Sequence, residues 1–128
     1  MKKIIYIIAF FFVSHPLSAQ DLISAQTDSL IKLGIRLSIE QSYDEAYAIY
    51  SGITKEQPKS PVGYFFQAAV LHSQMMDYEN YDHENEFYAL INKTIELSNL
   101  RLKKNYRDSW SYFFLGSGYG YLAFYQAK

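Results

Sequence analysis

Residues 42–61, SYDEAYAIYSGITKEQPKSP, contain the pattern that decides the fold. Large and small apolar residues recur here at the three- and four-residue spacing of one face of an α-helix: Tyr43, Ala46, Tyr47, Tyr50 and Ile53. Pro58 ends this predicted helix, because its ring cannot continue the helical backbone and disfavours helical geometry at Gln57. Pro61 then suits the first turn of another helix, where its missing N–H costs nothing.

A helix is also predicted before this stretch. Apolar side chains between residues 28 and 40 lie three and four apart, and Thr27 or Asp28 can cap the helix. Leu37 and Ile39 also alternate with polar neighbours, so a short strand is the alternative for these two residues. The longer stripe of apolar residues favours the helix.

After the quoted stretch, helical spacing predicts three more helices, at residues 62–76, 87–104 and 109–128. Asp108 is the predicted cap of the last one. The polar and acidic segment 77–86 is predicted to be a loop. No segment indicates a strand of comparable strength. The predicted fold class is all-α, built from antiparallel helix hairpins joined by short turns.

The small and aromatic positions of residues 27–60 resemble a tetratricopeptide repeat (TPR), a 34-residue helix-turn-helix unit. The residues that match the family pattern in this first unit are Leu33, Gly34, Leu37, Ala46, Tyr50 and Pro58. Leu30 replaces the family's Trp, and Ile53 replaces a small residue. The small Gly34 and Ala46 would let two helices approach closely, while Tyr50 would fill the space beside them.

Parts of the pattern recur further along the chain. A second unit would begin near Pro61 with Ala68 and Leu71, and a third is indicated by Leu115, Gly116 and Tyr119. The third unit lies about 14 residues further on than two regular repeats predict. We expect these extra residues in the acidic turn and the helix after it. The resemblance implies an α-solenoid of about two and a half repeats.

Residues 1–20 are predicted to be a signal peptide. They begin with two Lys after the initiator Met, continue with an apolar run over residues 4–13 and end in small residues. The run is shorter than the roughly 20 residues that a membrane-spanning helix needs. Cleavage is predicted after Ala19 or Gln20, leaving a domain over residues 21–128, with an uncleaved anchor as the alternative. The ending LSAQ resembles export signals of Bacteroidetes-type bacteria.

The charge and the cysteine content of the chain limit which partners and which cellular location are expected. Without the two Lys of the signal peptide, 10 basic side chains remain against 13 acidic ones, so the chain lacks the basic surface typical of nucleic-acid binding. No Cys is present to form disulfides or to carry the lipid of a lipoprotein. We expect a periplasmic or secreted protein of a Gram-negative bacterium that is not a lipoprotein.

The acidic segment is the main candidate for metal chemistry, with Asp77, Glu79, Asp82, His83, Glu84 and Glu86. As a calcium loop it has Tyr81 at the fifth ligand position and no Gly at the sixth. As a zinc site it offers one His and no Cys. The GSGYG of residues 116–120 lacks the spacing of a phosphate loop. We therefore predict no metal or cofactor, and no enzymatic activity.

The favoured function is a non-catalytic scaffold for protein–protein interaction. In the TPR family the first helix of each repeat lines a concave binding face, which here would use Ile31, Ile35, Phe65, Ala69, His72, Trp110, Phe113 and Tyr121. These side chains are mostly apolar, so the expected ligand is an extended peptide or a helix with apolar anchors. Any one of them is equally explained as a core residue. The Lys and Asn with which some relatives clamp a carboxylate are absent.

Two other function classes remain open. One is a membrane-associated subunit anchored by a helix over residues 109–127, where Gly116 and Gly120 form a small-xxx-small pair. The other is a helical metal-dependent enzyme that uses His72, His83 and the acidic turn. The last predicted helix is apolar on more than one side, so we also expect further repeats, a partner or a second copy to cover it.

Overall fold

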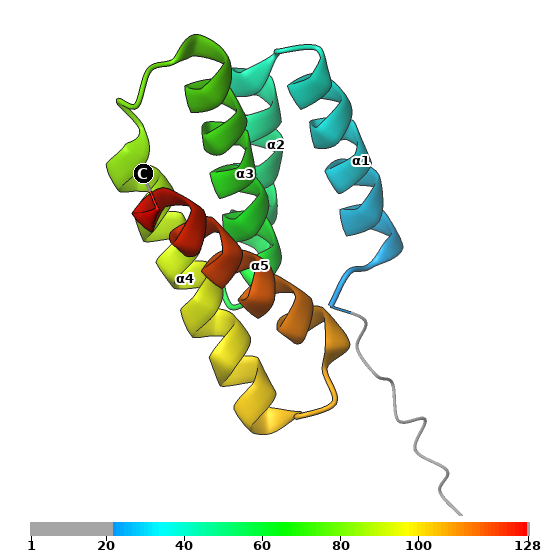
Figure 1. The fold of residues 1–128 in the computed structure, drawn as a ribbon. Helices are drawn as coiled ribbons and strands as arrows, with labels where there is room; N and C mark the ends of the chain where they lie inside the picture. Colours follow the sequence, from blue (N-terminus) through cyan, green and yellow to red (C-terminus); the bar gives the residue numbers. More distant parts are fainter. Residues whose placement is uncertain (1–21, 128) are drawn as a thin grey trace, which may run out of the picture.

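The computed structural model describes residues 22–127 as a bundle of five helices (Figure 1). They are α1 (Ala25–Ile39), α2 (Tyr43–Glu56), α3 (Pro61–Tyr78), α4 (Glu84–Lys104) and α5 (Ser109–Gln126). No strand occurs in this part of the chain, and both residues of the alternative strand lie in α1. The all-α prediction is therefore confirmed. The predicted signal peptide lies outside the described residues.

The helices pack mainly in chain order. Each one contacts the helix before it and the helix after it, and weaker contacts join α1 to α3 and α3 to α5. In Figure 1, α2 lies behind α3, and α4 lies behind α5. Consecutive hairpins thus build a short solenoid-like array, in which α1, α3 and α5 contribute to one face.

Of the two predicted helix caps, the one of α1 is wrong and the one of α5 is confirmed. Ser24, not Thr27 or Asp28, caps α1, because its hydroxyl accepts a bond from the Thr27 N–H at 3.1 Å. Thr27 is buried within the first turn, where its hydroxyl accepts a bond from Gln57 Nε2 at 3.0 Å. The prediction for Asp108 is confirmed: its carboxylate caps α5 by accepting a bond from the Ser111 N–H at 3.1 Å.

The acidic loop is shorter than predicted. Helix α3 continues to Tyr78 and α4 already begins at Glu84, so only residues 79–83 lie outside helices. Glu79 ends α3 in the left-handed conformation, at φ 50°. Carboxylates in the first turn of α4 favour helix there, because the helix N-terminus is positively polarised. With 18 and 21 residues against 15 and 14 in α1 and α2, the helices α3 and α4 absorb most of the extra length.

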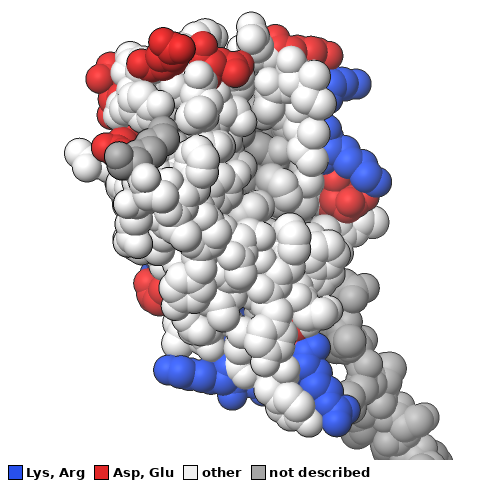
Figure 2. Space-filling model, in the orientation of Figure 1, with Lys and Arg blue, Asp and Glu red and all other residues white. Residues whose placement is uncertain are grey.

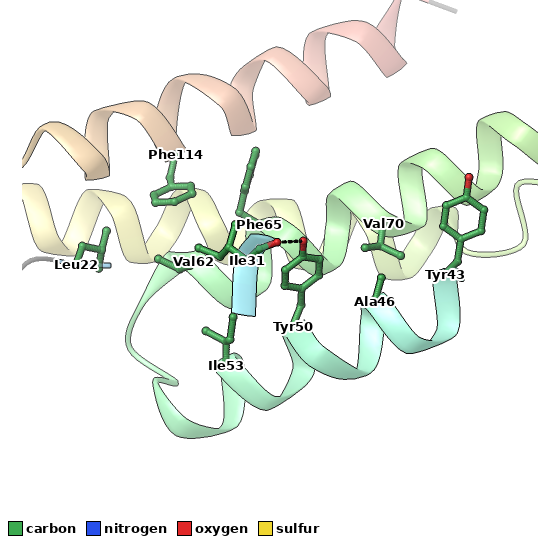
Figure 3. Close-up of a cluster of buried hydrophobic side chains, with 10 residues drawn as sticks. All are labelled: Leu22, Ile31, Tyr43, Ala46, Tyr50, Ile53, Val62, Phe65, Val70 and Phe114. Atoms are coloured by element: carbon green, nitrogen blue, oxygen red, sulfur yellow. Dashed lines mark hydrogen bonds between the residues drawn. The ribbon is translucent and has the colours of Figure 1, made fainter. Parts of the chain in front are cut away.

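The core of the first hairpin centres on Tyr50. Its ring is buried against α1, and its hydroxyl donates to the Ile31 carbonyl oxygen at 3.1 Å. The ring also stacks on that of Phe66 in α3, with the two ring centroids 5.1 Å apart. A Cβ at residue 34 would lie 2.7 Å from Tyr50 Cε1, so only Gly leaves room for this ring. Figure 3 shows the surrounding cluster, which comprises Leu22, Ile31, Tyr43, Ala46, Tyr50, Ile53, Val62, Phe65, Val70 and Phe114.

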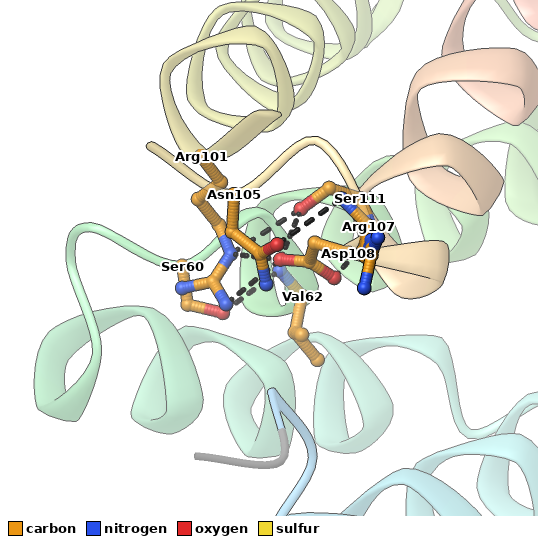
Figure 4. Close-up of polar contacts among 7 residues, drawn as sticks. All are labelled: Ser60, Val62, Arg101, Asn105, Arg107, Asp108 and Ser111. Carbon is orange, nitrogen blue, oxygen red and sulfur yellow. Dashed lines mark hydrogen bonds and ion pairs between the residues drawn. The ribbon is translucent and has the colours of Figure 1, made fainter. Parts of the chain in front are cut away.

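A polar network fixes the corner between α4 and α5 (Figure 4). Arg101 binds the Asp108 carboxylate through both Nε and Nη2 at 3.0 Å, and its Nε also lies 3.3 Å from Ser111 Oγ. The Ser111 hydroxyl donates to Asp108 at 2.9 Å. Burial alone would raise the pKa of Asp108, but the bonds from Ser111 and Arg101 outweigh it and lower that pKa. The carboxylate therefore stays ionised and holds the start of α5 against the end of α4.

Candidate peptide-binding groove

A groove of about 530 Å³ runs between α1 and α3. This volume falls within the roughly 300–1,000 Å³ that ligand sites occupy. Its lining residues are Ile35, Ser38, Ile39, Gln41, Tyr43, Tyr50, Phe66, Ala69, Val70, His72, Ser73, Met76 and Asp77. Most belong to two helical stripes, one on each helix, and the groove opens between α1 and α3 because these two helices contact each other only weakly.

The groove combines apolar side chains with short polar ones. Ile35 and Ile39 of α1 are exposed along one side, and Ala69 of α3 is half-buried on the other. The Ser38 hydroxyl donates to the Gly34 carbonyl oxygen of its own helix at 2.8 Å, so its hydrogen needs no acceptor from a ligand. These walls suit apolar side chains of a bound segment.

One carboxylate, that of Asp77, lines this groove. The Tyr43 hydroxyl and Gln41 Nε2 both donate to its Oδ2 atom, the latter at 3.2 Å. Burial, and then the bond to Asp77, raise the pKa of Tyr43 to about 12, so the phenol keeps its proton at neutral pH. Gln41 occupies the left-handed region, at φ 60°. Gln41 in the turn after α1 and Tyr43 at the start of α2 thus both bind this carboxylate.

A second hollow, of about 330 Å³, lies between α3 and α5. It is lined by His72, Ser117, Gly120, Tyr121 and Phe124. His72 lines both hollows and connects them across α3. Its Nδ1 lies 2.9 Å from the hydroxyl of Tyr125, and its ring meets that of Tyr121 edge-on at 5.0 Å. These contacts hold the imidazole among aromatic rings at the junction of the two hollows.

The predicted binding residues fall into three groups. Ile35, Ala69, His72 and Tyr121 line one or both of the hollows. Ile31 and Phe65 are core residues, only 7% and 8% exposed, and offer little surface to a ligand. Trp110 and Phe113 are exposed in the first turns of α5, outside both hollows, although Phe113 contacts the ring of Phe65.

Sequence reasoning missed several lining residues, among them Ser38, Ile39, Phe66, Ser73, Met76 and Asp77. A signal for many of them was present. Ser38 and Ile39 lie three and four residues after Ile35, and Ser73 lies four after Ala69, so continuing each helical stripe by one turn would have reached them. Asp77 follows Ser73 by four residues, but it falls in the segment 77–86 that the sequence predicts to be a loop.

The acidic segment forms an open turn with internal contacts. Asn80 Nδ2 donates to Asp82 at 2.9 Å, and His83 Nδ1 lies 3.8 Å from Glu86. Within residues 22–127, no three His, Cys, Asp or Glu side chains are grouped so that they could hold a metal ion. None of the described helices, α5 included, has the length and apolar character needed to cross a membrane.

Charge is segregated between the two ends of the molecule (Figure 2). Acidic residues gather at the end formed by the α1–α2 and α3–α4 turns, where residues 40–45 and 77–86 contain no Lys or Arg. Basic residues gather at the opposite end, near the α2–α3 and α4–α5 turns: Lys55, Lys59, Arg101, Lys103, Lys104 and Arg107. The face between the ends is largely uncharged in Figure 2.

Comparison of the chain with protein-family models, with curated proteins and with solved structures gives no significant match.

Proposed function

We propose that the protein is a non-catalytic scaffold of TPR type that binds a segment of another protein along the face formed by α1, α3 and α5. The observation that carries this proposal is the groove between α1 and α3, which His72 connects to the hollow beside α5. One hollow lies between α1 and α3 and the next between α3 and α5, and such a row suits an extended or helical segment better than a compact small molecule. The packing of Gly34 against Tyr50 and the chain-order hairpins support the assignment to the TPR type.

Site-specific photo-crosslinking tests this function. A photoreactive phenylalanine analogue at Ile39 would lie at the exposed edge of the groove, whereas the same analogue at the exposed Ala89 of α4 lies outside both hollows. In the native cell we expect a discrete protein adduct from position 39 and none of that mass from position 89. Equal adducts from both positions, or none from position 39, would contradict the proposed binding face.

The proposal includes export of the protein, since residues 1–20 have the pattern of a signal peptide. Intact-mass measurement of the protein from the native cell should show the loss of residues 1–19 or 1–20. A mature protein that retains its first 20 residues would contradict the export step, while the binding groove would remain a separate question.

A further inference from the structure

The charge of the groove indicates which segment it would bind. Asp77 is the one carboxylate among the side chains that line it, no Lys or Arg lines it, and Gln41 and Tyr43 both donate to the Oδ2 atom of Asp77. Among the ion pairs within residues 22–127, none includes Asp77. The carboxylate therefore lies beside apolar walls, and no Lys or Arg between residues 22 and 127 forms an ion pair with it.

The surroundings add to this negative charge. Asp77 lies at the acidic end of the molecule, together with Glu40, Asp44, Glu45, Glu79 and Asp82. Most basic residues lie at the opposite end, and Arg36, in the last turn of α1, lines a separate hollow with Lys32 and not this groove. A ligand that covered Asp77 with apolar atoms alone would desolvate a carboxylate without compensation, which is costly. An acidic ligand would be repelled as well.

We propose that the groove between α1 and α3 binds a protein segment that carries apolar side chains and one Lys or Arg, whose cationic group pairs with Asp77. The apolar side chains would lie along Ile35 and Ala69, towards His72. This inference rests on the proposed scaffold function. It specifies that the bound segment carries a positive charge and which end of the groove that charge occupies. The acidic end serves to select a cationic partner over neutral or acidic ones.

Selection from a phage library of random 12-residue peptides tests the proposal, with the purified protein as bait. We expect the enriched peptides to share apolar residues and a Lys or Arg at a fixed distance from them. The variant Asp77→Asn keeps a side-chain acceptor for Tyr43 and Gln41 but removes the charge. A synthetic peptide from the selection should bind this variant about tenfold more weakly.

The matched control is Asp82→Asn, which removes an equal charge from the same acidic end but outside the groove. We expect this variant to bind the peptide within about twofold of the unmodified protein, because Asp82 is exposed outside the groove and salt screens the charges of exposed groups. Equal losses in both variants would mean that the general field, not the pair with Asp77, selects the cation, and would overturn the proposal.

A groove-blocking variant separates this inference from the proposed function. Ala69→Trp fills the groove from α3, and Ser73→Trp one turn further along replaces it if circular dichroism shows that the first variant does not fold. If no peptide is enriched on the unmodified protein over the blocked one, both proposals fail. If apolar peptides are enriched without Lys or Arg, and Asp77→Asn binds them equally, only the charge pairing fails.

Two further outcomes would also overturn the pairing with a protein segment. Full displacement of the peptide by butylamine, with no contribution from its apolar residues, would identify a site for small amines. Self-association in sedimentation that Ala69→Trp abolishes would identify a second copy of the chain as the occupant of the groove.

Discussion

The first hairpin and the last helix share a sequence pattern but differ in packing. Leu33 and Gly34 in α1 correspond to Leu115 and Gly116 in α5. In α1, Gly34 is buried and admits the ring of Tyr50. In α5, Gly116 is exposed, and a Cβ there would meet no atom within 4 Å. The close approach in α5 occurs instead at Gly118, where a Cβ would lie 2.8 Å from Ile95 Cγ1 of α4.

The difference shows what the small residue is for. In α1 it faces α2, the helix that follows, and it is buried because that helix is present. Helix α5 is the last helix of the described residues, and its corresponding face is open. Large side chains are exposed along α5: Trp110, Tyr112, Phe113, Tyr119 and Phe124. The pattern in the sequence thus marks a helix–helix contact, and whether it is buried depends on the neighbouring helix.

The largest expected effect is in the packed hairpin, at Ala46. This side chain is 0% exposed, so Ala46→Trp would force a large ring into a filled contact and shift the backbone. We expect a loss of more than about 3 kcal/mol in the free energy of unfolding. Asp82→Ala, in the exposed turn, should change it by less than about 0.5 kcal/mol. Equal shifts in urea denaturation would contradict the tight packing of this hairpin.

The next effect separates two glycines of the same hairpin. Gly34→Ala would place a methyl group against the buried ring of Tyr50, at an expected cost of about 1–3 kcal/mol. Gly52→Ala, in α2, meets no atom within 4 Å and should stabilise the protein by up to about 1 kcal/mol through helix propensity. Thermal unfolding of both variants measures the difference. A neutral Gly34→Ala would mean that Tyr50 moves aside freely.

Much of the helical fold could be predicted from the sequence, because helix periodicity and proline positions are local signals. All five helices were predicted, and the start of α3 at Pro61 and the end of α2 before Pro58 follow from proline geometry. The site was predicted less well. Ile31 and Ile35 lie on the same helix one turn apart, yet one is buried and the other exposed, because burial depends on where Tyr50 and Phe66 pack. That tertiary arrangement is not a local signal.

A smaller effect is expected at the corner that attaches α5. Because the folded-state pKa of Asp108 is lowered, its contribution to stability is present above the unfolded value of about 3.9 and is lost as the pH falls through the folded-state value. Asp108→Ala removes cap and charge together and should cost about 1–2 kcal/mol at pH 7. Asp108→Asn retains a cap and should cost less.

Urea denaturation between pH 6 and pH 3 measures this contribution. The stability of the unmodified protein should fall more steeply towards acid than that of Asp108→Asn, so the two curves should draw closer as the pH falls. Curves that stay parallel over this range would mean that Arg101 and Ser111 do not stabilise the charged form of Asp108.

The smallest expected effect tests whether the open face of α5 is open in solution. Gly116 lies inside an exposed part of the helix, so Gly116→Ala should stabilise the protein by about 0.5–1 kcal/mol, because Ala loses less backbone entropy than Gly. Gly118→Ala is the matched control two residues away, where the added methyl group meets Ile95 and should cost stability instead. Thermal unfolding at several protein concentrations distinguishes the cases.

If Gly116→Ala destabilises the protein, and does so more at high concentration, a second copy packs on this face. If it destabilises the protein equally at every concentration, another segment of the same chain fills the space that faces Gly116. Only a gain in stability agrees with an uncovered face, and only that result would leave the exposed aromatic side chains of α5 accessible to a partner.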